Sequence, residues 1–186
     1  MRSPEISRFY LQVEADEDIV NWPDARIWDE LRTRLETVPG WTLATGPILE
    51  KSITPLRSFV AEPMQYERLF LAGDAAHIVP PTGAKGLNLA VADVSILCEA
   101  LSAYYRDQNT QLLQSYSARC LRRVWRAQHF SYWMTTLLHT FDHTDAYAQK
   151  LQRAYLDYVT SSHAAATTLA ENYVGLPLPG NNSQPA

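Results

Sequence analysis

The chain has 186 residues, of which 46% are hydrophobic, and this composition excludes an intrinsically disordered protein. Its 16 Lys and Arg against 20 Asp and Glu give a net charge of −4, without the basic stripe of a nucleic-acid surface. With only two cysteines, a disulfide scaffold is not expected and a cytoplasmic protein is favoured. The N-terminus is polar, which argues against a secretory signal, and the absence of an apolar run of about 18 residues argues against a membrane span.

The first third of the chain is predicted to be rich in strands. Residues 6–13 alternate between two faces, which is the period of a strand with one apolar side and one polar, aromatic side. Pro23 and Asp24 open a predicted helix, and Pro39 and Gly40 follow it as breakers. Further short strands are predicted over residues 48–53, 56–60 and 68–72.

From Gly86 onwards the pattern becomes helical. Predicted helices cover residues 87–105, 110–138, 147–158 and 164–173. The tail 177–186, rich in Pro, Asn and Gly, is predicted to be disordered. A strand-rich first part joined to a helical remainder indicates an α+β fold.

One segment, residues 69–88, carries most of the chemical information. It predicts a buried strand, a stop at Gly73, the acid Asp74, a loop rich in proline and glycine, and then a helix. A carboxylate after a strand lies where open sheets bind ligands, and it can accept hydrogen bonds from ribose-like or ribitol hydroxyls. Asp74 on its own would be interpreted as a turn or cap acid. The unpaired N–H groups at the helix start favour an anion, while Gly83 and Gly86 would let the backbone approach a flat ligand.

Gly73-Asp74, followed by Pro-Pro-Thr-Gly-Ala-Lys-Gly-Leu-Asn, resembles the second FAD motif of the single-component flavin aromatic hydroxylases. The resemblance continues through residues 50–53, 55–59 and 171–177, and within the family it is greatest to members that act on 4-hydroxybenzoate. It implies part of a two-domain flavin hydroxylase fold without the N-terminal dinucleotide-binding half, because no Gly-x-Gly-x-x-Gly turn occurs in the chain. The implied segments are the C-terminal part of a substrate-binding sheet domain (1–67), the second FAD-binding segment (68–106), a helical region (107–176) and the disordered tail (177–186).

The resemblance also implies roles for individual residues. Asp74 would hold the ribitol of FAD, and the charge of Lys85 would favour the reduced, anionic flavin. Pro81 would offer a fixed carbonyl to the substrate phenol, and Tyr173 would belong to the relay that removes the phenol proton, although Tyr173 could also be a core residue. The implied cofactor-binding residues are Gly73, Asp74, Gly83, Lys85, Gly86, Leu87 and Asn88; the substrate-binding residues are Arg2, Arg8, Tyr10 and Pro81; the catalytic residues are Pro81 and Tyr173.

The implied activity is the hydroxylation of 4-hydroxybenzoate to 3,4-dihydroxybenzoate with FAD, using NADPH or NADH and O2, in a homodimer that binds neither nucleic acid nor membrane. The isolated chain is expected to be inactive, because it lacks a cradle for the ADP half of FAD. Two alternatives stay open: a related flavin hydroxylase for another phenol or aromatic acid, and a non-catalytic remnant that acts only in dimerisation. No metal site is expected from the spacing of His and Cys.

Overall fold

A computed structural model describes residues 3–141 and 145–177, and these fall into two compact units. The first unit is Met1–Leu56 and the second is Arg57–Ala186. Most of the regular structure is helical and lies in the second unit, together with two small antiparallel sheets. The prediction that the first third of the chain is rich in strands is therefore wrong.

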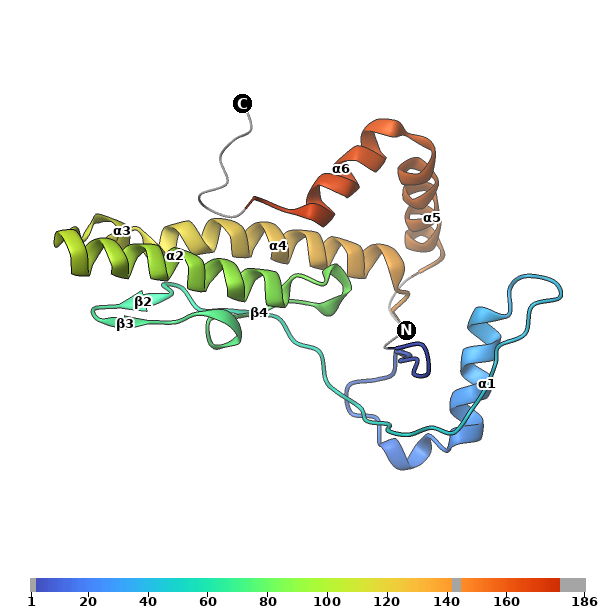
Figure 1. The fold of residues 1–186 in the computed structure, drawn as a ribbon. Coiled ribbons are helices and arrows are strands. Elements are labelled where there is room, and N and C mark those ends of the chain that lie inside the picture. The colour runs from blue at the N-terminus through green and yellow to red at the C-terminus, as the bar shows by residue number, and fades with distance from the viewer. Residues whose placement is uncertain (1–2, 142–144, 178–186) are drawn as a thin grey trace. The chain divides into compact units, whose positions relative to one another are not determined.

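The first unit is organised around α1 (Asp24–Leu35), which follows the short 3-10 helix η1 (Ile19–Asn21) (Figure 1). The helix begins directly after Pro23, as predicted, and buries Leu31. Lys51 ties the later part of the unit to the helix start, since its Nζ lies 2.7 Å from Asp24 Oδ1.

Residues 6–13 do not form the predicted strand, because they pair with no other strand in the described structure. A strand needs a neighbour whose N–H and C=O groups complete the ladder, and alternation alone does not supply one. The two faces are nonetheless distinct. Phe9 packs edge-on against Trp28 of α1, with ring centroids 6.2 Å apart, whereas the Arg8 guanidinium lies 5.3 Å from the Tyr10 ring centroid.

The strands of the second unit are shorter than predicted. In one sheet β1 (Phe59–Val60) pairs with β4 (His77–Ile78), and in the other β2 (Gln65–Tyr66) pairs with β3 (Leu69–Phe70). The predictions over 56–60 and 68–72 are thus confirmed only in part, and the one over 48–53 has no strand in the described structure. Pro55 and Pro63 lack the N–H that a ladder requires, which limits how far pairing can extend.

The helices of the second unit match their predictions more closely. α2 (Gly86–Asp107) and α4 (Tyr116–Leu138) lie side by side, joined by the short α3 (Gln111–Gln114), and α5 (Ala146–Ser161) and α6 (His163–Val174) follow (Figure 1). The helix predicted over 110–138 is interrupted at Ser115, whose hydroxyl donates to the Leu112 carbonyl at 3.1 Å. Apart from Pro177, the predicted disordered tail lies outside the described residues.

The core of the second unit lies between α2, α4 and the small sheets. α2 is long and apolar enough to cross a membrane by length and composition, contrary to the sequence expectation, but core helices of soluble proteins meet the same criterion. One face of α2 packs into the core and contains the buried polar residue Asp93. The clustered buried residues are Met64, Ala76, Leu89, Ile96, Tyr116, Cys120, Val124 and Ala127.

Candidate functional site

The turn that carries Asp74 is the 3-10 helix η2 (Gly73–Ala75), which comes soon after β3 and packs against α2. Gly73 has a φ of +63°, and an added Cβ would lie 3.2 Å from the Cβ of Ala90, so this position requires glycine. The Asp74 side chain is exposed and makes no hydrogen bond or ion pair with the residues that the structure describes. A carboxylate without a partner on a constrained turn is available to a donor from outside the chain.

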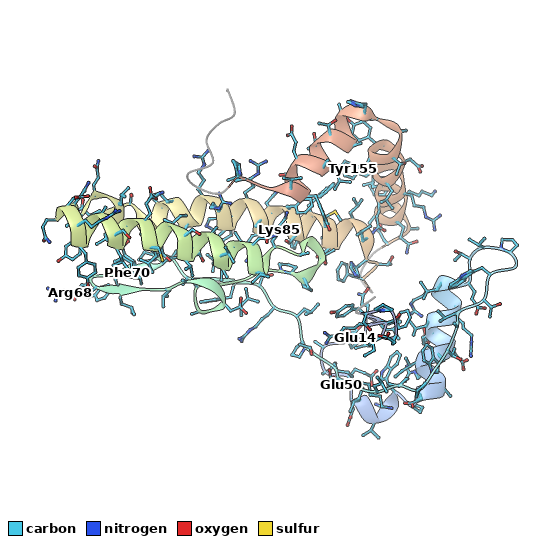
Figure 2. All side chains as sticks on the ribbon, in the orientation of Figure 1. Glu14, Glu50, Arg68, Phe70, Lys85 and Tyr155 are labelled. Atoms are coloured by element: carbon cyan, nitrogen blue, oxygen red, sulfur yellow. The ribbon has the colours of Figure 1, made fainter. Side chains whose placement is uncertain are left out.

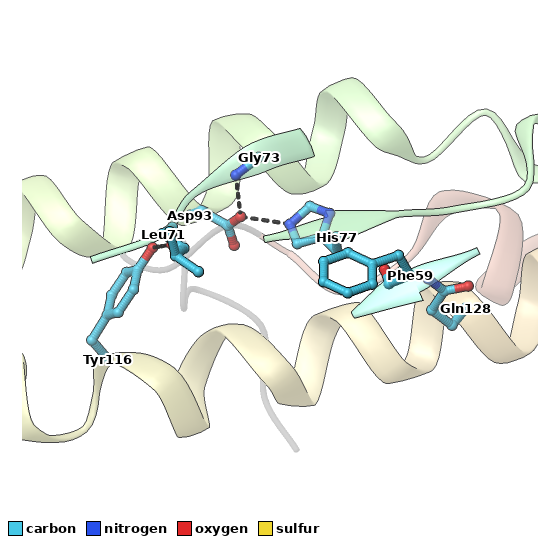
Figure 3. Close-up of polar contacts among 7 residues, drawn as sticks. All are labelled: Phe59, Leu71, Gly73, His77, Asp93, Tyr116 and Gln128. Atoms are coloured by element: carbon cyan, nitrogen blue, oxygen red, sulfur yellow. Dashed lines mark hydrogen bonds and ion pairs between the residues drawn. The ribbon is translucent and has the colours of Figure 1, made fainter. Parts of the chain in front are cut away.

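Buried side chains from two helices hold the main chain of this turn (Figure 3). Asp93 Oδ2 of α2 accepts the backbone N–H of Gly73 at 3.0 Å and lies 2.7 Å from His77 Nε2. The Tyr116 hydroxyl of α4 donates to the Leu71 carbonyl at 2.7 Å. Burial raises the pKa of Tyr116 well above its usual value, so this hydroxyl keeps its proton and remains a donor.

The loop after β4 is anchored to α4. Residues Pro81–Gly83 form the 3-10 helix η3, and Thr82 Oγ1 lies 2.8 Å from Thr135 Oγ1. Pro81 is exposed, and its carbonyl accepts the Ala84 N–H at 2.9 Å. A carbonyl oxygen has two lone pairs, so Pro81 retains acceptor capacity for a substrate hydroxyl.

The two glycines expected to admit a flat ligand differ in their surroundings. Gly83 is buried, and an added Cβ would lie 2.4 Å from Ser131 Oγ of α4, so packing between η3 and α4 accounts for glycine there. At Gly86 the nearest atom to an added Cβ is Val79 Cγ2 at 4.0 Å. The space beside Gly86 is therefore open, as an approaching ligand would require.

α2 begins at Gly86 with N–H groups that have no partner inside the helix. Its first backbone bond joins the Leu89 N–H to the Lys85 carbonyl at 2.9 Å, and no side chain caps the helix start. Leu87 is 78% exposed, and Leu87 and Asn88 both line an open cavity of about 370 Å³ that residues of α4 and α6 also border. An uncapped helix start beside such a cavity favours a ligand with negative charge.

Lys85 and Tyr173, for which the sequence implied separate roles, are in contact. Lys85, labelled in Figure 2, is only 7% exposed. Its Nζ donates to the Tyr173 carbonyl and lies 5.3 Å from the ring centroids of both Phe130 and Tyr173. Burial lowers the pKa of Lys85 from its usual value. Tyr173 is 56% exposed, and its hydroxyl forms no hydrogen bond with a described residue.

Arg123 is a residue of this region that the sequence did not single out. Its guanidinium donates to the carbonyls of Leu176 at 2.8 Å and Pro177 at 2.7 Å, which fastens the segment after α6 to α4. Several arginines lie along the same helix, and nothing in their spacing shows which one bonds to a distant backbone.

The expected substrate residues of the first unit stay a prediction. Arg8 and Tyr10, two positions apart in the alternating segment 6–13, do lie together. The predicted substrate site also includes Pro81 and Tyr173, and these two residues belong to the second unit. Arg2 lies outside the described residues.

Comparison with known proteins gives a family match and three relatives. Residues 1–131 match the model of the FAD binding domain family. Over 177 residues, 95% of its length, the chain is 54% identical to a p-hydroxybenzoate hydroxylase of Acinetobacter baylyi, and it covers 44% of that protein. A rifampicin monooxygenase of Streptomyces venezuelae is 56% identical over 43 residues, 23% of this chain and 9% of that protein. Aklavinone 12-hydroxylase of Streptomyces purpurascens is 35% identical over 88 residues, 47% of this chain and 14% of that protein, so the chain spans less than half of each relative.

Proposed function

The chain belongs to the FAD binding domain family, and from that membership we propose that it forms part of an FAD-dependent aromatic monooxygenase. Similarity to a p-hydroxybenzoate hydroxylase over 95% of the chain supports 4-hydroxybenzoate as the substrate and 3,4-dihydroxybenzoate as the product. One atom of O2 enters the ring, and the other leaves as water with the two electrons of NADPH or NADH. These 186 residues then supply one part of the enzyme's cofactor and substrate sites.

The exposed Asp74 carboxylate, free of partners among the described residues on a turn fixed by α2 and α4, is the observation that carries this proposal. It fits the ribitol of FAD, whose hydroxyls would donate to it. The uncapped N–H groups at Leu87 and Asn88 fit the pyrimidine edge of the flavin, where negative charge accumulates on reduction. The charge of Lys85, held at the same helix start, adds to that stabilisation.

FAD, when bound, supplies the redox chemistry, while the residues of this chain bind the substrate, orient it and move its proton. The Pro81 carbonyl would accept a hydrogen bond from the substrate's phenol hydroxyl, and the exposed Tyr173 hydroxyl would receive and pass on the phenol proton. Arg2 and Tyr10 would bind the substrate carboxylate, for which the guanidinium fork of Arg2 is suited, and Arg8 would lie beside the substrate next to the flavin. The chain contains no Gly-x-Gly-x-x-Gly turn, so the pyrophosphate of FAD would have to be bound by other residues.

A homodimer is the proposed assembly of the enzyme. Large side chains with apolar surface are exposed on α4 and α5, and such surfaces mark protein contacts when they are continuous. Light scattering at increasing protein concentration would give the mass, and a monomer at all concentrations would contradict this part of the proposal. The exposed residues are Tyr132, Leu138, Tyr147, Leu151, Tyr155 and Tyr158.

The test is to express the gene in full, with any residues that flank these 186 in the genome, and to follow NADPH and NADH oxidation with and without 4-hydroxybenzoate. Bound FAD, strong stimulation by this substrate and formation of 3,4-dihydroxybenzoate are expected. The similarity to enzymes named for rifampicin and aklavinone favours a second candidate, a flavin hydroxylase of another phenol. Stimulation by a different phenol would select that candidate, and a protein that binds no FAD would contradict both.

A further inference from the structure

Asp93 is a buried carboxylate on α2 to which the resemblance assigned no role. The exposed fractions are 0% for Asp93 and 1% for His77, and the two side chains meet at 2.7 Å. A buried carboxylate is costly unless it is paired and hydrogen-bonded, and an apolar residue would pack here without that cost. The carboxylate provides one feature that an apolar residue could not: Asp93 Oδ2 accepts a second hydrogen bond, which the backbone N–H of Gly73 donates.

Two more buried side chains hold the same stretch of main chain. Tyr116 donates to the Leu71 carbonyl (Figure 3). Gln128 Nε2 donates to the Ile78 carbonyl at 2.7 Å. The main chain from 71 to 78 is thereby fixed from α2 and α4 at points before and after Asp74.

The thiol of Cys120 lies in the same buried cluster. Burial above all, and next the charge of Asp93, raise the pKa of Cys120 to about 12, so this thiol is uncharged at neutral pH. It therefore adds no second negative charge beside the Asp93 side chain, whose Oδ2 stays hydrogen-bonded to His77 Nε2.

We propose that Asp93, together with His77, is a positioning residue for FAD, which holds the backbone of Gly73 so that the Asp74 carboxylate stays directed at the ribitol. The proposal rests on the proposed function, because it requires that Asp74 bind FAD. Without the bond to Asp93, the glycine can adopt a wider range of backbone conformations. The cost of ordering the turn would then fall on cofactor binding and weaken it.

Fluorescence titration of the apoprotein with FAD, on the protein expressed in full, measures the dissociation constant of each variant. Asp93→Ala is expected to weaken FAD binding about 10-fold, the change that the loss of one hydrogen bond of roughly 1.4 kcal/mol would produce. Asp93→Asn keeps an acceptor oxygen for Gly73 and is expected to retain most of the affinity. Ile96→Ala is the matched control, because Ile96 is equally buried on the same helix and makes no contact with the turn through hydrogen bonds.

The Ile96→Ala control distinguishes a specific effect on FAD binding from a general loss of protein stability. Ile96→Ala is expected to lower the stability of the protein but to leave the FAD dissociation constant within about 2-fold, because cavity formation acts on the core and not on the turn. Equal losses of affinity in Ile96→Ala and Asp93→Ala would overturn the proposal. So would an Asp93→Asn variant that binds FAD as poorly as Asp93→Ala.

A double-substitution cycle shows whether Asp93 acts through Asp74. In a protein that already carries Asp74→Ala, adding Asp93→Ala is expected to change the FAD dissociation constant little, since the oriented group is gone. A full further loss would contradict a positioning role. An unchanged affinity in Asp74→Ala alone would instead contradict the proposed function of Asp74, and the two failures are thus distinguishable.

Hydrogen exchange at the Gly73 amide gives a readout that needs no cofactor. This amide is expected to be protected in the native protein and to exchange faster in Asp93→Ala, while Ile96→Ala leaves it protected relative to the other amides of the unit. If Asp93→Ala does not fold, His77→Leu is measured in the same way, since it removes one of the two bonds of Asp93. A Gly73 amide that exchanges freely in the native protein would overturn the proposal.

Discussion

Replacing Gly83 by alanine should destabilise the second unit, mainly through the contact of the new Cβ with Ser131 Oγ. The new Cβ would lie 2.4 Å from Ser131 Oγ, and 3.3 Å from both Ser131 Cβ and a ring carbon of Phe130. Overpacking of this kind costs about 1–3 kcal/mol, whereas the reduced freedom of the unfolded chain returns only about 0.4–1 kcal/mol. Gly83 does not have a positive φ, so no backbone strain adds to the balance, and a net loss of about 1–2 kcal/mol is expected.

Urea unfolding followed by far-ultraviolet circular dichroism measures this loss, and Ser131→Ala provides the internal control. Ser131 Oγ is buried and has no hydrogen-bond partner among the described residues, so its removal alone should be close to neutral. In the Gly83→Ala/Ser131→Ala double variant the closest contact is gone, and most of the stability should return. If Gly83→Ala costs the same with and without the Ser131 hydroxyl, the packing argument is refuted.

Three further outcomes are expected. The exposed Cys98 should react rapidly with a thiol reagent, whereas the buried Cys120 should react only on unfolding. The pKa of Cys120 is raised from 9.0 to about 12 in the folded state, so the free energy of unfolding should fall as pH rises from 9 towards 12. This fall should be smaller in Cys120→Ala. Lys85→Met keeps most of the aliphatic side chain but removes the donor to the Tyr173 carbonyl, so it should cost about 1 kcal/mol. It should also speed amide exchange at the end of α6, as mass spectrometry would show. Tyr116→Phe leaves the Leu71 carbonyl without its donor and should cost about 1–3 kcal/mol in urea unfolding; no measurable loss would count against this bond.

The helices could be predicted from the sequence because their causes are local. Apolar spacing predicted α1, α2, α5 and α6, and Pro23 and Gly86 marked where two of them begin. The strands could not be predicted in the same way, because a strand exists only with a partner. Residues 6–13 have the alternation of a strand and no ladder within the described structure, whereas His77–Ile78 pairs with β1 without any alternation that predicted it.

The candidate site, too, has features that follow from local sequence and features that depend on distant contacts. Asp74, Lys85 and Tyr173 could be named from the resemblance, since each belongs to a contiguous run of residues. The bond between Lys85 and Tyr173 joins residues 88 positions apart, and it follows from how α6 returns to α2. Asp93 could not be recognised, because an acid in a largely apolar helix looks the same in the sequence whether it faces solvent or, as here, the backbone of a neighbouring turn.

The hydrogen bonds between Arg123 and the segment after α6 should respond differently to substitution of the donor and of the acceptor residues. The acceptors are the main-chain carbonyls of Leu176 and Pro177, and every amino acid carries such a carbonyl. The donor is a guanidinium, and no other side chain presents two parallel N–H groups in that geometry. A saturation mutagenesis screen should therefore find many residues accepted at position 176 and few at position 123. The attachment thus depends on the residue type of the donor and not on that of the acceptors.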